Sequence, residues 1–135
     1  MRITITLCLF CMILLVTYFS IGCSNHKADI VYPCDTTIVR YNVEIKNILD
    51  DHCQNCHGAD PSQNANSFGI NLYDYSTISS LALDVSHCSI GQLMASVSHD
   101  PCTDPSSFMP KGQPKISDCE ISKIRAWVNK GAPNN

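Results

Sequence analysis

The feature that most constrains this chain is the stretch "CQNCH" at residues 53–57, where two cysteines three positions apart are followed directly by a histidine. On a helix, residues i and i+3 share a face, and residue i+4 lies beside them. Cys53, Cys56 and His57 have these offsets, so both thiols can add to vinyl groups on one side of a porphyrin while the imidazole reaches the iron. The pattern favours one covalently attached haem c on a helix.

Three other interpretations of the motif remain open. A structural zinc site commonly uses two such pairs, and beyond the apolar N-terminal segment that holds Cys8 and Cys11 the chain has no second C-x-x-C. A thioredoxin-like dithiol is expected between strands and helices, whereas the pattern here is helical. With nine cysteines and five histidines, a chance match is expected in roughly a few per cent of such chains. Haem attachment explains the motif best.

The N-terminus has the pattern of an export signal. Residues 1–22 begin with Arg2 and continue as an apolar run that ends in small residues. The residues before Cys23 resemble a bacterial lipobox, with Ser20 where leucine is usual. We therefore expect a signal peptide over 1–22, a lipidated Cys23, a tether over 23–33 and one domain over 34–135. An uncleaved membrane anchor or simple secretion are the alternatives, and all three place the domain outside the cytoplasm. The lipidated Cys23 implies the cell envelope, on the periplasmic side or at the outer membrane.

The remaining cysteines indicate disulfides. Four are left after the N-terminal segment and the motif are set aside, and an even remainder in an exported domain is typical of a disulfide framework with three possible pairings. The net charge of −3 argues against nucleic acid as a partner. The four cysteines are Cys34, Cys88, Cys102 and Cys119.

Apolar spacing predicts three helices and no strand. The first covers 42–53 with Asn42 as N-cap, the second follows a Ser-x-x-Gln capping box that begins at Ser89, and the third follows the Ser117–Glu120 capping box and ends at Gly131. Residues 68–83 are expected to be wall-forming loop with a helical turn near 76–82, and 100–116 an irregular loop because it holds four prolines. The predicted fold class is all-α.

The order of these segments resembles a known family. An apolar helix, "CQNCH", a loop, "SSFMPKG" and a helix ending "AWVNKGAPNN" follow one another over residues 34–133. This order is similar to that of small class I c-type cytochromes, as in cytochrome c domains of bacterial envelope lipoproteins. The resemblance implies a cytochrome c fold of three to four helices around one haem. It implies thioethers at Cys53 and Cys56, His57 as proximal ligand and Met109 as distal ligand.

The residues around Met109 support that ligand independently. A thioether is a soft ligand that raises the haem reduction potential relative to a second histidine. Pro110 stiffens the loop, and Gly112 allows a close approach to the macrocycle. Met109 as a core side chain is the plain alternative. His99, Met94, His87 or an open position are the alternatives for the sixth ligand.

Further details of the site follow from the resemblance. The first and last helices of cytochromes c pack together, which suits a Cys34–Cys119 bridge and leaves Cys88 and Cys102 to close a loop. A metal-bound histidine normally donates its other N–H to a carbonyl, and for His57 we expect that of Asp60 or Pro61, with His52 facing solvent. Candidates for the haem wall are Phe68, Ile70, Leu72, Tyr73, Leu81, Leu93, Phe108 and Trp127.

The implied function is single-electron transfer between redox proteins of the cell envelope, which makes the chain an electron carrier rather than an enzyme. A haem enzyme or gas sensor with a labile sixth ligand, of peroxidase-like type, is the alternative from another class. A structural subunit of a larger complex is the third. The expected partners are redox proteins and, through the N-terminal anchor, a lipid membrane.

Overall fold

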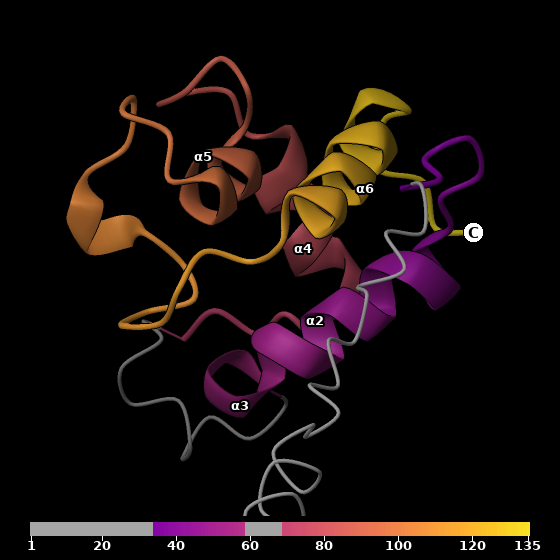
Figure 1. Ribbon diagram of the computed structural model, residues 1–135, viewed down its shortest axis with the longest axis horizontal. Helices are drawn as coiled ribbons and strands as arrows, with labels where there is room; N and C mark the ends of the chain where they lie inside the picture. Colours follow the sequence, from indigo (N-terminus) through magenta and orange to yellow (C-terminus); the bar gives the residue numbers. More distant parts are fainter. Residues whose placement is uncertain (1–33, 59–68) are drawn as a thin grey trace, which may run out of the picture. The chain divides into compact units, whose positions relative to one another are not determined.

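Helices make up the regular structure of residues 34–58 and 69–135, which are the residues that the computed structural model describes (Figure 1). The predicted all-α class is thereby confirmed. The signal segment, Cys23 and the tether, as well as Asp60, Pro61 and Phe68, lie outside the described residues. Within those residues no helix is long and apolar enough to cross a membrane. The elements are η1 (Tyr41–Ile45), α2 (Lys46–His52), α3 (Gln54–His57), α4 (Tyr75–Leu83), α5 (Gln92–Ser98), η2 (Pro105–Ser107) and α6 (Asp118–Asn129).

The first helical stretch starts one residue earlier than predicted, and Asn42 is not its N-cap. Arg40 holds the cap position, and its N–H donates to the Glu44 carboxylate at 2.8 Å. The N–H groups of Tyr41 and Asn42 donate instead to the side-chain and backbone oxygens of Asn135, at 2.8 and 2.9 Å. The last residue of the chain thus satisfies donors that every helix start leaves without partners.

The last helix, α6, follows its sequence signals closely. Both halves of the predicted capping box between Ser117 and Glu120 are formed. At the other end Gly131 has a φ of 83°. The N–H of Gly131 donates to the Val128 carbonyl at 2.8 Å, and the next N–H donates to the Trp127 carbonyl at 3.0 Å. This pair of bonds is the Schellman motif, which confirms the predicted glycine cap.

The middle of the chain departs in part from the predictions. The helical turn expected near 76–82 is present and is longer, because residues 75–83 form the nine-residue helix α4, capped by the Asp74 carboxylate, which accepts from the Thr77 N–H. The predicted Ser89–Gln92 capping box is wrong, because α5 starts after Gly91 without a side-chain cap. Gly91 has a φ of 87°, and a Cβ there would lie 2.5 Å from the Ala82 carbonyl oxygen. The close approach of α4 therefore sets where α5 begins.

Trp127 forms the centre of the core. Its side chain is 0 % exposed, stacks on Tyr41 at 5.8 Å between ring centroids, and donates its indole N–H to the Pro133 carbonyl. The Tyr41 ring also meets Tyr75 edge-on at 4.9 Å. The stacking contact joins α6 to η1 and the edge-on contact joins η1 to α4, while α5 packs on both α4 and α6. Trp127, a candidate for the haem wall, is thus a core residue of the helix packing.

Two cysteine pairs lie at disulfide distance. Cys34 pairs with Cys119, with 5.4 Å between their Cα atoms, and Cys88 pairs with Cys102, with 5.8 Å between theirs. These are the pairs that the family resemblance implied. The first ties the segment before η1 to α6, and the second ties the approach to α5 to the loop that follows it.

Candidate functional site

The three residues of the sequence motif lie together on the short helix α3. Cys53 is its N-cap, and the Cys53 carbonyl accepts from the N–H of Cys56 at 3.1 Å and from the N–H of His57 at 2.9 Å. The three side chains are therefore carried by little more than one helical turn, as the spacing predicted. The backbone geometry matches what attachment to one porphyrin requires.

The two motif cysteines are free, whereas the other four described cysteines are bridged. Cys53 is partly buried against the core and Cys56 is exposed. Burial, together with the nearby Cys56 and Glu120, raises the pKa of Cys53 to about 11. A redox-active or nucleophilic dithiol needs a thiol whose pKa is lowered instead. The environment thus argues against the thioredoxin-like interpretation.

The zinc interpretation also loses support. The four bridged cysteines cannot supply thiolate ligands, so the part of the chain that the structure describes offers the motif no second cysteine pair to complete a tetrahedral site. Across residues 34–58 and 69–135, no group of three or more histidine, cysteine, aspartate or glutamate side chains is arranged to hold a metal ion.

His57 is buried and held in one orientation. Its ring Nδ1 lies 3.2 Å from the Ile70 carbonyl oxygen, and its own carbonyl accepts from the Leu72 N–H at 2.8 Å. Because a carbonyl oxygen only accepts, Nδ1 carries the hydrogen, and Nε2 has its lone pair available. The partners expected from the sequence, Asp60 or Pro61, lie outside the described residues, and among the described residues Ile70 has this role. Gly69, which has a φ of 74°, precedes Ile70, and a glycine at this place is a sequence signal for a turn.

Gly58 ends α3 directly after the histidine. A Cβ at this position would lie 2.7 Å from the Gln54 carbonyl oxygen, well inside contact distance. The residue after His57 must therefore be glycine for the last turn of α3 to close as it does. The structure therefore requires a glycine at position 58, one residue after the five-residue motif.

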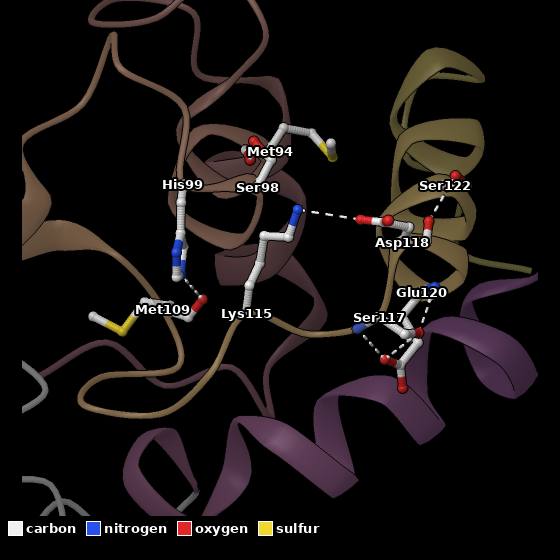
Figure 2. A network of polar contacts seen from close by, with 9 residues as sticks. All are labelled: Met94, Ser98, His99, Met109, Lys115, Ser117, Asp118, Glu120 and Ser122. Carbon is white, nitrogen blue, oxygen red and sulfur yellow. Dashed lines mark hydrogen bonds and ion pairs between the residues drawn. The ribbon is translucent and has the colours of Figure 1, made fainter.

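Met109, the proposed distal ligand, lies in the loop between η2 and α6. Its N–H donates to the Ser96 carbonyl at 3.1 Å, and its carbonyl accepts from Nε2 of His99 at 3.1 Å. The Met109 backbone is thus held by the end of α5, whereas His57 is held by residues 70–72. Figure 2 shows the Met109 side chain extending away from the His99 ring and from α6.

The other sulfur and imidazole candidates have different surroundings. Met94 is 2 % exposed and packs in the core from α5, which suits a packing role. His87 is exposed. His99 has its Nε2 engaged by the Met109 carbonyl and its ring stacked on Phe108. Among these residues, Met109 is therefore the better candidate for a sixth ligand.

A polar link that the sequence pattern did not predict joins the motif region to α6. His52, expected to face solvent, is partly buried, and its Nε2 lies 2.9 Å from Oε1 of Glu120. The other carboxylate oxygen of Glu120 accepts from the N–H and hydroxyl of Ser117 at 2.9 and 2.7 Å. Burial alone would raise the pKa of Glu120, but the hydrogen bonds from Ser117 and His52 outweigh it and hold the pKa below its usual value.

Comparisons of the chain with protein-family models, with characterised proteins and with solved structures found no match. The residues themselves fit a c-type haem. Cys53 and Cys56 are unbridged thiols on one helical turn, His57 presents an available Nε2 with its Nδ1 already bonded, and Met109 supplies a thioether from a separate segment.

Proposed function

We propose that residues 34–135 form a monohaem class I c-type cytochrome that carries single electrons between redox proteins of the cell envelope. The observation that carries this proposal is the burial and hydrogen bonding of the His57 ring. The imidazole follows two free cysteines on one turn, is buried, and has Nδ1 bonded to the Ile70 carbonyl. Proteins fix metal-bound histidines in this way.

In this proposal Cys53 and Cys56 would hold the haem through thioether bonds, and His57 and Met109 would supply the imidazole and thioether ligands to its iron. The bound haem supplies a reversible one-electron couple of its iron. The Ile70 carbonyl fixes the orientation of the His57 ring and increases the basicity of its free nitrogen. The Met109 thioether favours a higher reduction potential than a second histidine would.

The proposed location is the outer side of a membrane. The export pattern of residues 1–22 and the lipobox-like Cys23 support a lipid anchor. The two disulfides support an oxidising compartment, because such bonds persist outside the cytoplasm. Cys23→Ser should release the protein from membranes into the soluble fraction. Persistent anchoring in that variant would instead favour an uncleaved N-terminal segment.

Covalent attachment is tested with the two motif cysteines. The full chain is expressed with a haem maturation system, and Cys53→Ala combined with Cys56→Ala should abolish haem staining on a denaturing gel. A matched pair, Cys34→Ser with Cys119→Ser, also removes two cysteines but should keep the stain, because those residues bridge each other. Staining that survives in the Cys53/Cys56 variant would refute the proposal.

The axial ligands decide between an electron carrier and a haem enzyme or gas sensor. We expect a low-spin ferric spectrum with the methionine–iron charge-transfer band, and loss of that band in Met109→Ala. A high-spin ferric spectrum, or ready binding of carbon monoxide by the ferrous protein, would indicate an open sixth position. That result would replace electron transfer by the peroxidase-like or sensor function.

A further inference from the structure

We propose that His99 is a positioning residue that fixes the Met109 loop so that the thioether can act as the sixth ligand. The inference rests on the proposed function and concerns the same site. It starts from three contacts at the end of α5 that involve Met109, its neighbour Phe108 and the residues Ser96 and His99.

The backbone of Met109 is bonded on both sides. Its N–H donates to the Ser96 carbonyl and its carbonyl accepts from the His99 ring, each at 3.1 Å. The donor and acceptor partners are three residues apart at the end of one helix, so they are fixed relative to each other. Two bonds to one peptide segment set both its place and its orientation, which determines where the Met109 side chain projects (Figure 2).

The ring of His99 is itself held in place. It stacks on Phe108 with 4.5 Å between centroids and 3° between planes. Because Phe108 precedes Met109, the ring contacts two successive residues of the loop. Moving the ring would lose both the stacking and the hydrogen bond.

The backbone of His99 also points to a dedicated role. His99 is the C-cap of α5 and has a left-handed conformation, with a φ of 55°. This region is unfavourable for a side chain with a Cβ, although histidine enters it more often than most residues. Glycine would serve as a cap without that cost. Histidine is not needed to end α5, but its ring is needed for the hydrogen bond to the Met109 carbonyl.

The hydrogen bond also argues against His99 as the sixth ligand. Nε2 carries the hydrogen that the Met109 carbonyl accepts, so this nitrogen has no lone pair for iron while the bond exists. A neutral thioether is a ligand that a competing base can displace, and its retention depends on how well the loop is held. His99 therefore acts through Met109 rather than in its place.

The test measures how easily free imidazole displaces the methionine. The ferric holoprotein is titrated with imidazole while the methionine–iron band and the Soret band are followed. His99→Ala loses one hydrogen bond and one ring stack, and we expect the apparent imidazole affinity to rise about tenfold. His99→Gln keeps an N–H donor and should stay within about threefold of the wild type.

Two further variants keep the test decisive. His99→Phe retains a stacked ring but has no donor, so it should show most of the increase even if His99→Ala does not accumulate. His87→Ala removes an exposed histidine and should match the wild type. An unchanged imidazole affinity in His99→Ala or His99→Phe, with the methionine–iron band present in the wild type, would overturn the positioning role alone. A wild-type protein without that band would overturn the ligand set of the proposed function and this inference with it.

Discussion

The link between His52, Glu120 and Ser117 should stabilise the fold, and Glu120→Ala removes it. The substitution deletes the acceptor for the Ser117 N–H and hydroxyl and the partner of His52. The His52 and Glu120 side chains are 33 % and 26 % exposed, so solvent screens the link in part. The Ser117 hydroxyl still caps the backbone N–H of residue 120 in this variant. Loss of the other half of the capping box and of a partly screened charge-assisted bond should lower the free energy of unfolding by about 2 kcal/mol.

A second variant separates the cap from the link to His52. Glutamine also serves in a capping box, so Glu120→Gln keeps an acceptor for Ser117 but replaces the oxygen that faces His52 by an NH2 group, and it loses the negative charge. We expect a loss below about 1 kcal/mol at pH 7. The pKa of Glu120 in the folded chain lies below its ordinary value of 4.5. The charge therefore stabilises the fold above that value, and its contribution is lost as the pH falls through the lower folded pKa.

The assay is urea unfolding of the holoprotein, followed by circular dichroism between pH 7 and pH 3. The difference between wild type and Glu120→Gln should shrink as the solution becomes more acidic. Asp118→Asn is the matched control, because Asp118 lies in the same helical turn, has a 91 % exposed side chain and forms an exposed ion pair with Lys115. This variant should change stability by less than about 0.5 kcal/mol. If Glu120→Ala loses no more stability than this control, or if the Glu120→Gln difference does not depend on pH, the reasoning is wrong.

Three other predictions concern backbone and covalent constraints. Gly91→Ala should destabilise the domain by about 2 kcal/mol or more in urea unfolding. Its φ is left-handed, and the added Cβ would lie 2.5 Å from the Ala82 carbonyl oxygen. Unchanged stability would contradict this close contact between residue 91 and α4. Gly58→Ala should disturb the last turn of α3 and lower the yield of covalent haem per unit of protein, whereas an equal yield would show that the turn adapts. Cys34→Ser with Cys119→Ser opens a disulfide of sequence separation 85 and should lower the free energy of unfolding by about 4–5 kcal/mol, because the unfolded chain gains entropy. A decrease smaller than the roughly 3 kcal/mol expected for opening the Cys88–Cys102 disulfide would contradict this explanation.

Some of the fold could be predicted because its signals are local. Ser117 and Glu120 satisfy the start of α6 within one turn, and Gly131 ends it. The helical turn expected near 76–82 is longer in the structure, where α4 covers Tyr75–Leu83. Only Ile78 and Ala82 of this helix are fully buried, while Tyr75 and Leu81 are partly buried, which leaves a weak apolar pattern. The packing of α4 on α5 is a contact that the local sequence does not mark.

The sequence by itself determined the helical class and the candidate chemistry, since the offsets of Cys53, Cys56 and His57 are set by the geometry of one helical turn. Only the tertiary structure decided which partners hold those groups. His57 is oriented by a carbonyl thirteen residues away, and Met109 by a histidine ten residues away. Such bonds depend on how loops return to helices, and carbonyl acceptors are present at every residue, so no residue type marks the one that is used.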